Sequence, residues 1–222
     1  MKKDTFVLDG HRITLFDVSS GTDAAVIYMH FAVDEAENIL GALPFPVILA
    51  AIEVDWNRDL TPWAAPKVMP KGKSFTGGAD AYLETLCTRI IPAVEARLPV
   101  PPRFRAIAGY SLAGLFAVYA LYRTDVFDRA ASLSGSLWFD GFEDYQDSHT
   151  PLRVPEKLYF SLGDREHLTK YPRMARCADC TARTRARFEA FGSHTTFHPE
   201  SGGHFQDIPG RIVRGLIWLC ED

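Results

Sequence analysis

Ser111 lies in a stretch whose residue types favour a nucleophile. The predicted strand 103–108 leads to Gly109, and small residues follow the serine where a helical pattern begins. A sharp strand-to-helix turn requires small neighbours, because larger side chains would clash across it. That turn would expose the serine hydroxyl at the helix N-terminus, where the backbone N–H of Leu112 can donate to a developing oxyanion. Because Ala113 replaces the second glycine of the usual Gly-x-Ser-x-Gly pattern, an ordinary strand-to-helix turn is the alternative interpretation.

A serine nucleophile needs a base, and the chain order nucleophile, acid, histidine directs the search to the last part of the chain. Of seven histidines, His198 and His204 lie there. His204 follows two glycines in the loop before the last predicted helix, which gives its imidazole room to reach the serine. His198 precedes Pro199 near the end of a strand, where a packing role is favoured. We therefore predict His204 as the base; its alternative is a helix-capping or surface histidine.

The acid that orients the histidine is expected in the loop after the predicted strand 157–162. Two carboxylates stand there, Asp164 and Glu166. Asp164 could cap the turn after Gly163, whereas Glu166 has the longer reach. An ion pair with a nearby basic side chain is the alternative for either residue.

A second oxyanion donor is expected at the end of the strand 24–30, which should run beside the strand that carries the serine. The backbone N–H groups of Phe31 and Ala32 would lie near the required place. His30 could shape the pocket or satisfy a hydrogen bond in the core.

Substrate choice is expected from the irregular stretch 55–78, which is rich in Pro, Trp, Gly and Lys. A segment of this length without regular structure is usually functional. An aromatic lining could be added by three further residues, which could equally belong to the core: Trp138, Phe139 and Phe142.

The elements that must position these residues follow from hydrophobic patterning. Two short strands, 5–8 and 12–18, meet at Asp9-Gly10, which predicts an antiparallel hairpin. Continuous apolar runs then predict strands buried on both faces, as in a parallel sheet. Further strands are predicted over 24–30, 46–53, 103–108, 127–133, 157–162 and 195–198, and helices over 34–40, 80–98, 112–122, 171–191 and 205–219. This order predicts a single α/β domain over residues 1–222, with helices on both faces of one sheet and reacting groups at the strands' carboxyl ends.

Composition narrows the function classes. The chain has 222 residues, 47% of them hydrophobic, and a net charge of −4 with scattered Lys and Arg, so no nucleic-acid partner is expected. The N-terminus lacks the apolar core of a signal peptide and no run approaches 18 apolar residues, so we expect a cytoplasmic location and no membrane association. Cys177 and Cys180 form a lone CxxC without further ligands, so no metal or other cofactor is predicted. Exposed loop aromatics leave a homodimer open.

Several strings, taken in order, resemble the putative esterase family of α/β-hydrolases, which includes the trilactone siderophore esterases and is related to esterase D. The resemblance covers the chain from about Ala24 onward. Its strongest pieces are Gly109-Tyr110-Ser111-Leu112-Ala113-Gly114-Leu115, Ser134-Gly135-Ser136-Leu137-Trp138, Ser161-Leu162-Gly163-Asp164-Arg165-Glu166 and Gly203-His204-Phe205.

The resemblance implies an α/β-hydrolase fold with Ser111 as nucleophile and His204 as base. The family's Gly-x-x-Glu string falls on residues 163–166 and points to Glu166 as the acid. Because some siderophore esterases look like serine-histidine dyads, a site without an acid stays open.

The segment 57–63 is similar to a loop that lies beside the site in such enzymes. Arg58 could there contact an anionic or polar substrate, or pair with Asp59. The short chain and Ala113 depart from the family's pattern.

These inferences combine into one hypothesis, a serine esterase that acts on a small-molecule ester through an acyl-enzyme. An acyltransferase would use the same acyl-enzyme with a different acceptor. A hydrolase-like scaffold used only for binding, with an idle serine, is the third possibility.

Overall fold

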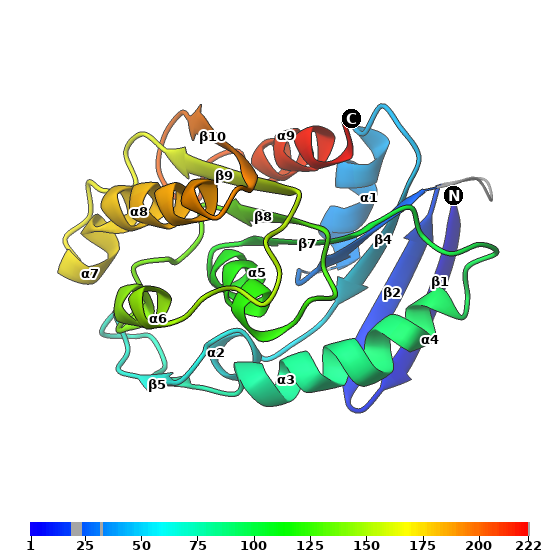
Figure 1. Cartoon of the computed structure of the whole chain (residues 1–222), viewed down its shortest axis with the longest axis horizontal. Coiled ribbons are helices and arrows are strands. Elements are labelled where there is room, and N and C mark those ends of the chain that lie inside the picture. The colour runs from blue at the N-terminus through cyan, green and yellow to red at the C-terminus, as the bar shows by residue number, and fades with distance from the viewer. Residues whose placement is uncertain (19–23, 32, 222) are drawn as a thin grey trace.

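In the computed structural model, which describes residues 1–18, 24–31 and 33–221, a central sheet of eight strands runs in the order β1-β2-β4-β3-β7-β8-β9-β10 (Figure 1). β2 is antiparallel to both β1 and β4, and the other neighbouring strands are parallel. The predicted antiparallel opening and parallel continuation are therefore confirmed. The strands are β1 (Lys2–Leu8), β2 (His11–Asp17), β3 (Ala25–Met29), β4 (Val47–Ile52), β7 (Arg105–Tyr110), β8 (Arg129–Leu133), β9 (Lys157–Gly163) and β10 (His194–Glu200).

The N-terminal hairpin turns at the two residues that the sequence indicated. Asp9 and Gly10 both have positive φ, 49° and 83°, and Leu8 pairs with His11 across the turn. Two successive positive φ angles give the tight turn whose twist matches that of the strands.

Helices cover both faces of the sheet, as predicted. Along β7, Ile107 faces the core cluster that contains α5, whereas Ala106 and Ala108 face the cluster that contains α9. Figure 1 shows α9 at the top of the view and α3 at the bottom. The helical elements are α1 (Val33–Gly41), α2 (Trp56–Asp59), α3 (Ala79–Thr85), η1 (Leu86–Ile90), α4 (Ile91–Glu95), α5 (Leu112–Arg123), α6 (Phe142–Ser148), α7 (Pro172–Ala175), α8 (Cys177–Ala190) and α9 (Ile208–Cys220).

Some boundaries differ from the prediction. The helix expected over 80–98 contains a π-helical segment, η1, just before Pro92, whose ring and missing N–H disturb regular α-helical bonding. The helix expected over 171–191 is divided at Arg176. The stretch 55–78 contains α2 and a small antiparallel pair, β5 (Ala64–Ala65) and β6 (Phe75–Thr76), and α6 was not predicted.

The last helix begins at Ile208 rather than at residue 205. Pro209 occupies its first turn, where the missing N–H costs nothing, and Asp207 before it has a positive φ of 51°. Residues 201–206 are therefore a loop. Because these strands are parallel, one edge of the sheet holds the carboxyl ends of β7, β8, β9 and β10. The loop 201–206 follows β10 at that edge.

Candidate active site

Ser111 occupies a strained turn between β7 and α5. Its φ of 57° is rare for a residue with a side chain and costs free energy, so the surroundings must hold it. Its N–H donates to the carbonyl of Leu133 at 3.0 Å, and its carbonyl accepts from the N–H of Ser136 at 2.9 Å. A Cβ at Gly109 would overlap the backbone of Ala113, so the close approach of strand and helix requires glycine at 109 and tolerates alanine at 113.

His204 lies between the serine and an acid. Its Nε2 is 3.0 Å from Ser111 Oγ, and its Nδ1 is 2.7 Å from Glu166 Oε2. The hydroxyl of Tyr110 donates to the carbonyl of His204 at 2.6 Å, which fixes the backbone of the loop. A proton on Nδ1, directed to the carboxylate, leaves Nε2 free to accept the serine proton.

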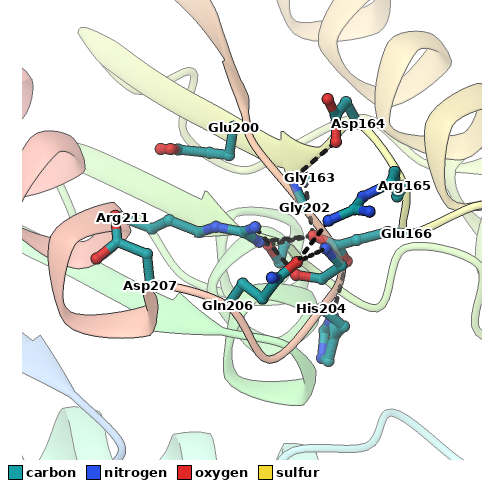
Figure 2. A network of polar contacts seen from close by, with 12 residues as sticks. Gly163, Asp164, Arg165, Glu166, Glu200, Gly202, His204, Gln206, Asp207 and Arg211 are labelled. Carbon is teal, nitrogen blue, oxygen red and sulfur yellow. Dashed lines mark hydrogen bonds and ion pairs between the residues drawn. The ribbon is translucent and has the colours of Figure 1, made fainter.

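Glu166 uses its two oxygens differently. Oε2 contacts His204, whereas Oε1 accepts from the Gly163 N–H at 2.7 Å and from Arg211 Nη1 at 2.8 Å (Figure 2). Oε1 also accepts from Ser134 Oγ at 2.7 Å. Burial by itself raises the pKa of this carboxyl, but the hydrogen bonds from His204, Gly163 and Ser134 outweigh burial and lower the pKa below its usual value. Glu166 is therefore a carboxylate at neutral pH.

Asp164, the other predicted acid, has a different place. Its Oδ1 accepts from the Gly202 N–H at 2.7 Å, and its own N–H donates to the Glu200 carbonyl at 2.8 Å. Asp164 thus joins the loop after β9 to the loop that carries His204.

Two of the predicted oxyanion residues, Leu112 and Phe31, line the hollows that Ser111 also lines. Leu112 is the first residue of α5, whose N-terminal N–H groups have no acceptor within the helix. Phe31 follows β3 and lines the same hollow as Ser111 and His204. Ala32 lies outside the described residues.

Two hollows flank the serine and the histidine, with volumes of about 260 and 300 Å³. Ser111, His204 and Phe205 line both of them. Phe205 is 81% exposed, so it is available to contact a bound molecule on either side. Apolar lining residues of the first hollow include Met29, Phe31, Trp56, Ile208 and Ile212, and those of the second include Val68, Met69, Phe75, Trp138 and Met174.

The predicted substrate residues divide into two groups. Trp138 lines the second hollow, whereas Phe139 and Phe142 are buried in the core. Arg58 is not brought to the serine, because it lines a separate hollow together with Asp9 and His11. Its guanidinium pairs with Asp59 at 2.7 Å, which is the alternative that the sequence left open.

Four polar residues of the site were not predicted: Tyr110, Ser134, Ser136 and Arg211. Ser136 Oγ is 3.3 Å from Ser111 Oγ, and the other three contact the acid or the histidine loop. Arg211 carried a usable signal, because it falls on the stripe of α9 that is otherwise apolar, three residues after Ile208 and one before Ile212. A charge on such a stripe indicates a buried partner.

Cys177 and Cys180, the two cysteines of the CxxC, lie in the first turns of α8. Within the described residues, no cluster of three or more His, Cys, Asp or Glu side chains is placed to hold a metal ion. Cys177 and Cys180 are buried free thiols, and burial raises the pKa of Cys177 to about 11. Of the helices in the described part of the chain, none has both the length and the hydrophobicity needed to cross a membrane.

The sheet order and the serine turn at the end of β7 define an α/β-hydrolase fold, and solved structures share it. Siderophore hydrolase EstA from Aspergillus nidulans superposes with a TM-score of 0.76 at 19% identity, over 98% of this chain and 92% of that one. An IroE-like serine hydrolase from Shewanella oneidensis gives 0.76 at 17% identity, over 98% of this chain and 79% of that one.

The model of the putative esterase family matches residues 6–206, and the chain belongs to this family. A siderophore triacetylfusarinine C esterase from Aspergillus fumigatus is 34% identical over 143 residues, which are 61% of this chain and 44% of that protein. A siderophore enterobactin esterase from Emericella nidulans is 30% identical over 117 residues, which are 48% of this chain and 38% of that protein. Each match thus spans less than half of the relative's length.

Proposed function

We propose that this protein is a serine hydrolase that cleaves a carboxylic ester of a small molecule. The observation that carries the proposal is the pair of contacts made by His204, 3.0 Å to Ser111 Oγ and 2.7 Å to Glu166 Oε2. Membership of the putative esterase family supports the same reaction class. The siderophore esters named for the two relatives make this class of ester the first to screen.

In the proposed mechanism, Ser111 Oγ attacks the ester carbonyl carbon while His204 Nε2 takes its proton. The carbonyl oxygen becomes an oxyanion that accepts hydrogen bonds from the N–H groups of Leu112 and Phe31. The carbon–oxygen bond of the ester then breaks, and His204 returns the proton to the departing alcohol. A water molecule deprotonated by His204 attacks the acyl carbon of the acyl-enzyme. The bond between that carbon and Ser111 Oγ then breaks, the carboxylic acid leaves, and His204 returns the proton to Ser111 Oγ.

Glu166 has an orienting and electrostatic part in this mechanism. The imidazole becomes positively charged in each half-reaction, and the adjacent carboxylate stabilises that charge without taking the proton. The lowered pKa of Glu166 keeps it charged through the neutral range.

The two hollows support an ester with an apolar group on each side of the reacting carbonyl. Both linings are largely apolar and meet at Ser111, so the acyl and alcohol parts would occupy different hollows. Trp138 would contact the part that enters the second hollow.

The test is hydrolysis of p-nitrophenyl esters of increasing acyl length by the wild type and Ser111→Ala, with Ser148→Ala on α6 as the control for an exposed serine. We expect release of p-nitrophenol by the wild type and the control, and a loss of at least about 10⁴-fold in Ser111→Ala. Equal rates for all three proteins would contradict the proposal. Adding alcohol, sugar or thiol acceptors tests the acyltransferase alternative, which predicts acyl transfer to the acceptor faster than to water.

A further inference from the structure

Arg211 is a cation in the interior of the protein. Its side chain is 0% exposed, and it extends from the first turns of α9 toward the end of β9 and the histidine loop (Figure 2). Charged side chains are rarely buried so fully without a role for their partners, because removing a charge from water is costly.

Its guanidinium contacts both Glu166 and the loop that carries His204, whose relative position the proposed mechanism depends on. Nη1 donates to Glu166 Oε1 at 2.8 Å and also lies 2.9 Å from Ser134 Oγ and 3.0 Å from the Tyr110 hydroxyl. Nη2 donates to the carbonyls of Ser201 and Gly203, each at 3.0 Å. One planar group thus binds the acid and the backbone on the N-terminal side of His204.

The packing leaves little freedom in this arrangement. A Cβ at Gly163 would overlap the carbonyl of Gly202 and lie within contact of both Arg211 and Glu166. The Gly203 N–H is held in turn by Gln206 Oε1 at 2.6 Å. Because Oε1 of Glu166 is held by three donors, only Oε2 remains directed at the imidazole.

We propose that Arg211 is a positioning residue that fixes Glu166 and the His204 loop relative to Ser111, and whose charge compensates that of the buried Glu166 carboxylate. This inference rests on the proposed function. A buried Glu166 carboxylate without a compensating cation would stabilise a proton on His204, and a protonated imidazole cannot accept the serine proton.

Two other carboxylates near the Arg211–Glu166 pair already have a cationic partner. Glu200 on β10 and Asp207 before α9 both pair with Arg214, at distances of 2.5 and 2.8 Å. Further ionisable groups beside this network are Asp164 and Arg165 from the loop after β9, Tyr110 from β7 and Cys177 from α8. Arg211, in contrast, forms an ion pair with Glu166 at 2.8 Å.

The experiment is the pH dependence of kcat/KM for a p-nitrophenyl ester in Arg211→Met, Arg211→Lys and a control, Arg105→Met. Arg105 also holds a glutamate by two bonds, to Glu95 at 2.6 and 2.8 Å, but it stands at the opposite end of β7 from Ser111. Thermal unfolding of each variant separates lost stability from lost positioning.

In Arg211→Met, we expect kcat/KM at its pH optimum to fall about 10²-fold and the acid limb to move to higher pH by about one unit. Arg211→Lys should keep the acid limb near that of the wild type, because the charge remains, but lose about tenfold in rate because one ammonium cannot replace both ends of the fork. Arg105→Met should keep the wild-type profile. An unmoved acid limb in Arg211→Met, or an equal movement in Arg105→Met, would overturn the inference.

Should Arg211→Met not fold, Arg211→Lys decides: unchanged kcat/KM at every pH would contradict a positioning role. A second readout is the downfield NMR resonance of the His204 Nδ1 proton, recorded in the inactive Ser111→Ala background. We expect it to be lost or shifted when Arg211→Lys is added, and its persistence unchanged would count against the inference. If the wild type itself hydrolyses no ester, the proposed function fails instead.

Discussion

On one side of Ser111, the acid and the histidine are held by buried groups that hydrogen-bond to one another, whereas the hollows beside it are lined mostly by apolar side chains. Glu166 alone accepts from four groups, counting His204, Ser134, the Gly163 N–H and Arg211. Phe205, which lines both hollows, is 81% exposed.

The two regions face different physical demands. Proton transfer depends on distance and direction, so the polar side is fixed by directional bonds among groups that have lost water. Apolar contact depends mainly on area and tolerates changes of shape. We therefore expect changes on the polar side to affect kcat, and changes on the apolar side to affect KM.

The largest effect within this comparison is expected for Glu166→Gln. The neutral amide retains hydrogen-bonding atoms but cannot stabilise the imidazolium, so kcat should fall by about 10²–10⁴-fold with little change in KM. Steady-state kinetics with a p-nitrophenyl ester measures both constants. Asp164→Asn is the matched control, because its side-chain oxygen can still accept from Gly202; we expect kcat within about threefold of the wild type. A larger loss of kcat in Asp164→Asn than in Glu166→Gln would show that Glu166 is not the acid.

A smaller effect, on the other constant, is expected for Phe205→Ala. The ring should be covered when substrate binds, and loss of that apolar contact should raise KM by about three- to tenfold while kcat stays within about twofold. Phe191→Ala, at the C-terminal end of α8, removes a half-exposed ring elsewhere and should leave both constants unchanged. A fall in kcat without a rise in KM would show that the two regions are not separate.

The third effect concerns stability and not the kinetic constants. Because the pKa of Glu166 is lowered on folding, its contribution to the free energy of unfolding is complete above its unfolded pKa and is lost as pH falls through the folded value. Urea unfolding of the wild type and Glu166→Gln between pH 7 and 3 should show their difference narrowing below about pH 4.5. At pH 7 the difference in the free energy of unfolding should be ~1.5–3 kcal/mol, the range for hydrogen bonds to a charged group. A difference that is constant with pH would mean that folding leaves this carboxyl's pKa unchanged.

The sequence predicts the architecture well where patterns are local. Asp9-Gly10 and the continuous apolar runs indicate the hairpin and the parallel strands, because turn geometry and burial on both faces act on neighbouring residues. The small residues around Ser111 likewise predict its turn, since the steric demand lies within five positions.

Contacts between distant residues are harder to predict. The role of Arg211 depends on how α9 meets the loops after β9 and β10, which no local pattern specifies. Arg211 belongs to the site and was not predicted, whereas Arg58 was predicted and lies elsewhere. Its residue type and its loop were suitable, but it lines a different hollow. Glu166 and Asp164 could be separated only by the geometry that brings one to the imidazole and the other to Gly202.

The central claim is that Ser111 is a nucleophile activated by His204. Labelling with a fluorophosphonate probe tests it most directly, with mass spectrometry to locate the modified peptide and with Ser111→Ala and His204→Ala as comparisons. We predict an adduct on Ser111 in the wild type, none at that position in Ser111→Ala and much slower labelling in His204→Ala. Folded wild-type protein that acquires no adduct, or acquires it equally fast without His204, would contradict the account.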